Sequence, residues 1–201
     1  MTWNDSLRRL TAQLTGHKPS LYPTEELDDL MDIKIARLST NGFEGDRLTY
    51  ALALKSGLHL FNESLDPSHD LSQEIHTPTG SYWHGIMHRM EGDYGNAKYW
   101  FRLVGRHPVY EALAGEIGTL LKQTDLRQIG SAVLREPLER LKDEGAWDPY
   151  LFVDMVECQV TQARDAAGEA LLMDMQHIEM LLLLEHCYAE SGGEGELLEP
   201  R

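Results

Sequence analysis

The sequence has few cysteines, no long apolar run and little positive charge. The two cysteines, Cys158 and Cys187, lie in apolar helical patterns, so we expect buried thiols rather than a disulfide. No apolar segment approaches the roughly 20 residues that a membrane-spanning helix needs. Residues 1–6 lack the basic and apolar regions of a secretory signal. From these absences we expect a cytoplasmic protein that does not associate with membranes.

The charge balance and the missing motifs exclude several functional classes. Lys and Arg number 18 against 33 Asp and Glu, which gives a formal charge of -15 and opposes nonspecific binding to nucleic acid. The sequence contains no Gly-rich phosphate loop, no G-x-S-x-G elbow, no paired C-x-x-C and no Cys/His signature of a thiol enzyme. The motifs therefore do not decide whether the protein is an enzyme.

The apolar residues that are present follow helical spacing, and no segment shows a convincing strand alternation. We predict an all-α fold, a single-domain helical bundle of about eight helices over residues 1–191, followed by a flexible acidic tail at 192–201. Residues 171–188 are apolar on several sides, which predicts a buried central helix. Residues 150–188 could form two helices or one bent helix, with Gly168 as the weak point.

Residues 80–107 are predicted to form a central helical hairpin. Gly92 suits the left-handed position that closes a helix, and Asp93 can cap the helix that follows. With Gly85, Ala97 and Phe101, this turn resembles a single tetratricopeptide hairpin, although no second copy adjoins it. The resemblance implies an adaptor that binds a partner peptide and whose histidines are structural.

A longer pattern covers the same hairpin. Residues 82–100 read YWHxxMHRxEGDxxNAKYW. This string resembles an uncharacterised family of bacterial and fungal proteins, and that resemblance implies no reaction and no catalytic residues.

Three side chains of the first hairpin helix share one face. His84 and His88 are four residues apart and Glu91 follows three residues later, while His69 on a preceding short helix could add another ligand. Imidazole and carboxylate ligands in this arrangement suit a divalent ion such as Zn, Fe, Mn or Ni. Two other interpretations stay open, namely a metal-free polar pocket and hydrogen-bonded structural histidines. His84 also lacks the following Glu that metalloproteases require.

Basic and aromatic residues suggest an anion site on the same hairpin. Lys98, Arg102 and Arg106 form one stripe on the second helix, and these cations could instead pair with acidic helices nearby. The leading hypothesis is a pocket for a small anionic ligand, with or without a divalent metal. In an enzyme, His84 or His88 would be a metal ligand or general base, with Glu91 as ligand or orienter and Arg89 as anion clamp. The candidate ligand-binding residues are Arg89, Lys98, Arg102, Trp83 and Trp100.

Overall fold

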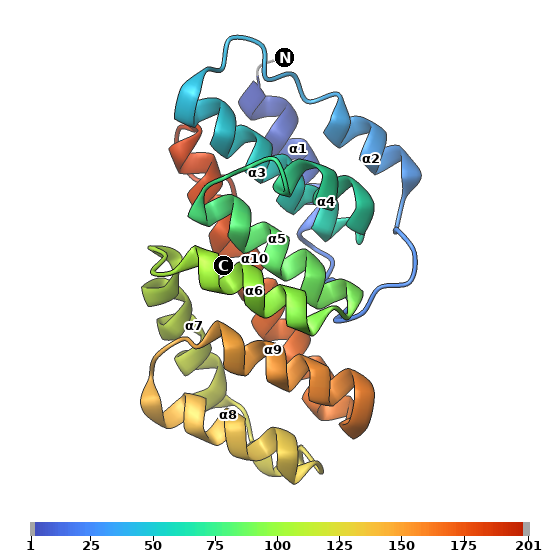
Figure 1. Cartoon of the computed structure of the whole chain (residues 1–201), viewed down its shortest axis with the longest axis vertical. Coiled ribbons are helices and arrows are strands. Elements are labelled where there is room, and N and C mark those ends of the chain that lie inside the picture. The colour runs from blue at the N-terminus through green and yellow to red at the C-terminus, as the bar shows by residue number, and fades with distance from the viewer. Residues whose placement is uncertain (1–2, 199–201) are drawn as a thin grey trace.

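The computed structural model describes residues 3–198, and these residues form an all-helical protein with no strand (Figure 1). This confirms the predicted fold class. Residues 3–198 contain ten α-helices rather than about eight, together with a 3-10 turn at Leu126–Gln128 and a π-helical turn at Gln159–Ala163. The helices are α1 (Trp3–Leu14), α2 (Asp29–Ala36), α3 (Gly45–Phe61), α4 (Leu65–Ser72), α5 (Pro78–Glu91), α6 (Tyr94–Val104), α7 (Val109–Gln123), α8 (Ala132–Glu144), α9 (Pro149–Cys158) and α10 (Ala166–Glu190).

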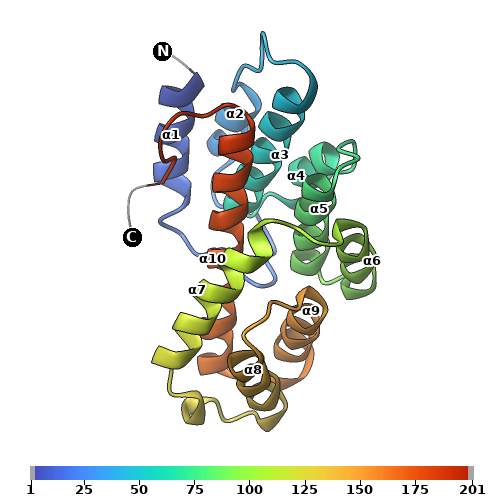
Figure 2. The same ribbon diagram turned by 90° about the vertical axis from the view of Figure 1, so that its left-hand side faces the viewer.

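Helix α10 occupies the middle of the molecule and includes the segment 171–188 that was predicted as the central helix. It packs against α3 and α7, and Figure 2 shows it running between α1 on one side and α3 to α5 on the other. Leu172, Met180 and Leu181 are buried and point in different directions around this helix. Burial on several sides is what its broad apolar pattern predicts.

The start of α10 differs from the expectation. Its N-cap is Asp165, whose side chain accepts a hydrogen bond from the N–H of Gly168. The break therefore lies at Arg164, in the left-handed conformation with φ 46°, and Gly168 is inside the first turn of the helix. A good side-chain cap outweighs the weak helix propensity of one glycine.

Helices α5 and α6 form the predicted pair, with bounds that differ from 80–107. Thr77 caps α5 by accepting a hydrogen bond from the N–H of Gly80, and Gly92 closes it with φ 86°. Asp93 then caps α6, which ends at Gly105. The short capped turn brings the two helices into antiparallel contact.

Small residues allow α3, α4 and α5 to pack closely. A Cβ atom on Gly57 of α3 would lie 2.5 Å from the ring of Trp83 on α5. A Cβ atom on Gly80 would lie 2.2 Å from the backbone oxygen of Ile75, just after α4. These approaches hold α4 and α5 side by side, which matters for the site described below (Figure 1).

The segment after α10 has fixed contacts as far as it is described. Figure 2 shows it crossing from the end of α10 to α1, where Arg8 Nη2 donates to the carbonyl oxygen of Glu194 at 2.7 Å. Leu197 is buried, and the N–H of Leu198 donates to Glu185 Oε1 at 2.7 Å. Residues 192–198 of the predicted flexible tail thus make contacts with α1 and α10, its flexibility stays a prediction, and 199–201 lie outside the described residues.

No helix within residues 3–198 combines the length and the apolar character needed to cross a bilayer.

Candidate functional site

Three histidines meet where α4 packs against α5. His69 comes from α4, His84 and His88 come from α5, and their ligating nitrogens all lie within 4.8 Å of one another. The rings of His84 and His88 stack with centroids 4.6 Å apart, and the His69 ring meets His84 edge-on at 4.8 Å. The helical spacing places two of these rings together, and the packing of α4 on α5 brings the third.

His84 is held in its neutral form. Its side chain is only 2% exposed, and its Nδ1 atom is buried without a hydrogen-bond partner among the described residues. The pKa of His84 is lowered to about 3, mainly by burial and also by the nearby charges of His88 and His69, against a hydrogen bond to the backbone of Ser72 that raises it. At neutral pH this imidazole therefore carries no proton that a metal ion would have to displace.

His88 has a defined orientation. Its Nδ1 atom lies 2.5 Å from Glu91 Oε1, and Asn96 Nδ2 lies 3.0 Å from its Nε2 atom. These partners assign the tautomer in which Nδ1–H donates to the carboxylate and Nε2 carries the lone pair. Glu91 groups with His88 and Asp93 rather than with the other two histidines. It is thus placed as a partner of His88, not as a fourth member of the cluster.

Helix α6 packs two side chains against this histidine cluster. The ring of Trp100 stacks on His84 with centroids 3.9 Å apart and an interplanar angle of 15°. Asn96 lies four residues before Trp100, so both side chains reach α5 from the same face of α6. Trp100 was predicted as a site residue and Asn96 was not, although their four-residue spacing places both side chains on one face of a helix.

The basic stripe on α6 has other contacts. Lys98 forms an ion pair with Asp154 on α9, and Arg102 lies over the ring of Tyr99 with 5.3 Å between Cζ and the ring centroid. The residues of α6 that contact the histidine cluster are Asn96 and Trp100. For Lys98, the structure follows the interpretation in which a cation pairs with a nearby acidic helix.

Arg89 differs most from the role expected for it. Its side chain is fully buried, and Nη2 lies 2.6 Å from Oε2 of Glu179, which is also fully buried. Tyr82 donates to the other carboxylate oxygen at 3.0 Å, and Gln176 Oε1 accepts from Arg89 at 3.3 Å. Arg89 is therefore not an accessible anion clamp, because it already neutralises an acid of α10. Within α10, Glu179 stands between the apolar residues Ile178 and Met180, and this was the available signal for the pair.

Trp83 is also a core residue rather than a pocket wall. It is fully buried against α3, and its Nε1–H donates to Cys187 Sγ at 3.4 Å. Both cysteines are free thiols, as expected, but only Cys187 is buried and Cys158 is half-buried. Burial raises the pKa of Cys187 to about 12, which keeps this thiol protonated.

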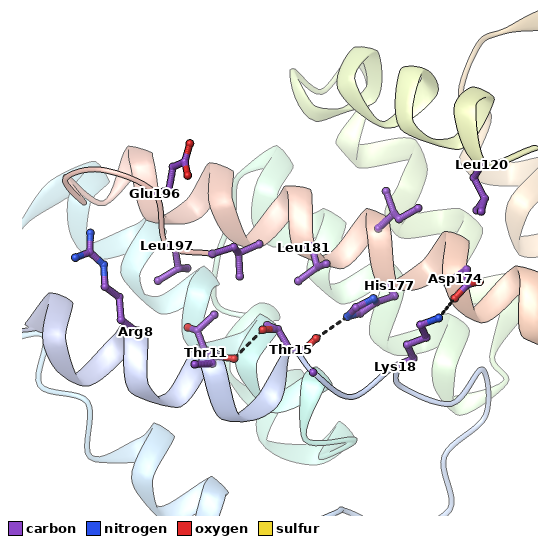
Figure 3. Close-up of a pocket in the computed structure, with 14 residues that line it drawn as sticks. Arg8, Thr11, Thr15, Lys18, Leu120, Asp174, His177, Leu181, Glu196 and Leu197 are labelled. Atoms are coloured by element: carbon purple, nitrogen blue, oxygen red, sulfur yellow. Dashed lines mark hydrogen bonds and ion pairs between the residues drawn. The ribbon is translucent and has the colours of Figure 1, made fainter. Parts of the chain in front are cut away.

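A large open cavity lies on the other side of the molecule, between α1, α10 and the segment after α10 (Figure 3). Its volume is about 1110 Å³. Lys18 and Asp174 form an ion pair at one end, and His177 Nε2 lies 2.9 Å from the carbonyl oxygen of Thr15 (Figure 3). Arg8 and Glu196 also line it, so both signs of charge are present. Charge alone does not select a ligand class for this cavity.

Comparisons with known proteins do not assign the chain to a family. No protein-family model matches it, and neither the curated proteins nor the solved structures include a significant match.

Proposed function

We propose that this protein binds a divalent transition-metal ion, best matched by zinc, through His69, His84 and His88. The observation that carries the proposal is the approach of three ligating nitrogens, from two helices, to within 4.8 Å of one another. Neutral imidazole is a preferred zinc ligand, and three protein ligands leave a fourth tetrahedral position for water or an anion. An anionic ligand would then bind through the metal and would not need Arg89.

The separation of the nitrogens is close to that of a tetrahedral site. Zn–N bonds of about 2.0 to 2.1 Å place tetrahedral ligands about 3.4 Å apart. A bound ion would require these nitrogens to move closer together than the 4.8 Å within which they now lie. His69 is half-buried and offers the ring with most freedom to close the site.

Two features of the cluster favour a metal over structural histidines. A metal would give the buried Nδ1 of His84 the partner that the described residues do not supply. The low pKa of His84, about 3, also means that metal binding at neutral pH does not compete with a proton on that ring. Purely structural histidines of a buried cluster would be expected to have their polar atoms satisfied.

Glu91 and Asn96 both contact His88, one of the proposed ligands. A carboxylate that accepts the Nδ1–H of a ligating histidine fixes its ring and increases its basicity, as Glu91 would do for His88. The Nε2 lone pair of His88 would then face the metal. Asn96, which is half-buried and now donates to Nε2, would turn aside on binding.

The test is a direct measurement of metal binding. Protein purified without a polyhistidine tag is analysed for metal content by mass spectrometry, stripped with a chelator and titrated with Zn²⁺ by calorimetry. We expect one Zn²⁺ per chain, and loss of binding in His84→Ala and in His88→Ala. At a Zn²⁺ concentration of 100 times Kd, the native state should gain about 2.7 kcal/mol of stability.

Matched variants separate the cluster from general histidine effects. His76→Ala removes an exposed histidine between α4 and α5 and should bind Zn²⁺ like the unmodified protein. His69→Ala changes a half-buried ligand, so it tests the site even if the more buried variants unfold. Glu91→Gln should weaken binding by about 10- to 100-fold without abolishing it. Equal Zn²⁺ affinity in His69→Ala and His76→Ala would refute the proposal.

The alternative function, an adaptor that binds a partner peptide, would rest on a different part of the surface. Leu27, Leu30 and Ile33, in and just before α2, are 49%, 62% and 46% exposed. Exposed apolar residues that cluster are typical of protein-binding surfaces. The two functions can be distinguished, because Leu30→Asp with Ile33→Asp would alter such a surface and leave Zn²⁺ binding unchanged.

A further inference from the structure

A second cavity, of about 630 Å³, lies between α1, α2 and the connection that leads to α3. Its apolar side is formed by Trp3, Leu10, Leu38 and Phe43. The rings of Trp3 and Phe43 meet edge-on with centroids 5.1 Å apart, so they make an aromatic corner. A cavity of this size with apolar and aromatic walls has the dimensions of a small-molecule site.

The charges around this cavity are all positive. Arg9 comes from α1, while Lys34 and Arg37 come from the last turn and the C-cap of α2. Among the described residues that line the cavity, none is acidic, although the whole chain carries a formal charge of -15. Cations are common at helix C-termini because they offset the helix dipole. That preference accounts for Lys34 and Arg37, and Arg9 lines the same cavity from another helix.

Polar side chains also surround the opening of this cavity. Ser6, Gln13, Ser39 and Asn41 supply further polar groups around the opening.

We propose that this cavity binds an amphipathic organic acid, a molecule with an apolar or aromatic body and one anionic head group. The body packs against Trp3 and Phe43, and the head group is held by Lys34, Arg37 and Arg9. Arginine can bind a carboxylate through two parallel hydrogen bonds, which favours an acid over a neutral analogue. The site shares no residue with the histidine cluster, so it is independent of the proposed metal function.

The test uses a fluorescent probe of the proposed class. The aromatic sulfonate 1-anilinonaphthalene-8-sulfonate is titrated into the full-length protein and then displaced with octanoate or with octanol. We expect saturable binding, with displacement by octanoate and little displacement by octanol at equal concentration. Added salt should weaken octanoate binding, because exposed charges at the opening are screened.

Two double variants locate the site. Lys34→Glu with Arg37→Glu should weaken octanoate binding by at least about tenfold, because two attractive charges become repulsive. Lys122→Glu with Arg106→Glu changes the net charge equally at exposed positions outside the cavity, and should bind as the unmodified protein does. Circular dichroism confirms that both variants fold.

A third variant tests the aromatic corner. Trp3→Leu removes one ring of the aromatic corner and keeps an apolar side chain, so it should weaken octanoate binding while the protein stays folded. Equal octanoate affinity in the two double variants would overturn the proposal, as would equal displacement by octanol and octanoate. Neither result would bear on Zn²⁺ binding, which is measured separately.

Discussion

The buried ion pair between Arg89 and Glu179 gives a sharp prediction about stability. Both side chains are fully buried, and the pair links α5 to α10 at 2.6 Å. Glu179→Leu would leave the guanidinium of Arg89 buried without its counter-charge, and Tyr82 would lose the carboxylate oxygen to which it donates. An uncompensated buried charge is far more costly than the loss of the attraction alone.

The expected magnitude follows from this burial. Breaking a buried pair by removing one partner costs about 3 to 5 kcal/mol, which for a chain of this size lowers Tm by about 6 to 20 °C. The pair between Lys98 and Asp154 is a matched control, because its side chains are 35% and 55% exposed. Asp154→Ala should cost less than about 1 kcal/mol.

Urea unfolding of a double-mutant cycle measures the effect. The cycle compares Glu179→Leu, Arg89→Met and the double variant with the unmodified protein. The double variant should recover much of the stability lost in Glu179→Leu, because apolar side chains of similar size fill the space without a buried charge. The reasoning is refuted if Glu179→Leu costs no more than Asp154→Ala, or if the double variant is less stable than both single variants.

Two further predictions concern pH and packing. Because the pKa of His84 is lowered from 6.5 to about 3, the unfolded chain takes up a proton that the folded chain excludes, so the free energy of unfolding falls as pH drops from 6.5 toward 3. In His84→Phe, the free energy of unfolding measured with urea should fall less as pH drops below 6.5. A pH profile equal to that of the unmodified protein would contradict the low pKa of His84. Gly57→Ala should cost about 1 to 3 kcal/mol because its Cβ would lie 2.5 Å from Trp83. Gly118→Ala, with no atom within 4 Å, should instead raise the free energy of unfolding by up to about 1 kcal/mol.

Local features of the fold were predictable where a few neighbouring residues decide them. Gly92 and Asp93 form the turn between α5 and α6 because one adopts the left-handed conformation and the other caps the next helix. Asp148 likewise caps α9 before Pro149 by accepting from two backbone N–H groups. The bounds of the hairpin differ by a few residues from the predicted 80–107, because helix ends are defined only to within one or two residues.

The candidate site was predictable only in part. The spacing of His84 and His88 follows from helix geometry and places both rings on one face of α5. The approach of His69 depends on the packing of α4 against α5, for which the sequence offered only proximity along the chain. Arg89 follows His88 directly, and a step of one residue turns it to another face of the helix, where Glu179 of α10 neutralises it.

By itself, the sequence determined that this protein is helical, where several helices begin and end, and which side chains share a helix face. These properties depend on backbone geometry and on contacts within about four residues. Only the tertiary structure decided which faces meet. It buried Arg89 against Glu179, gathered three histidines from two helices, and placed Arg9, Lys34 and Arg37 around one cavity. Such long-range contacts depend on how the apolar faces of distant helices pack together, and periodicity along the chain does not encode that choice.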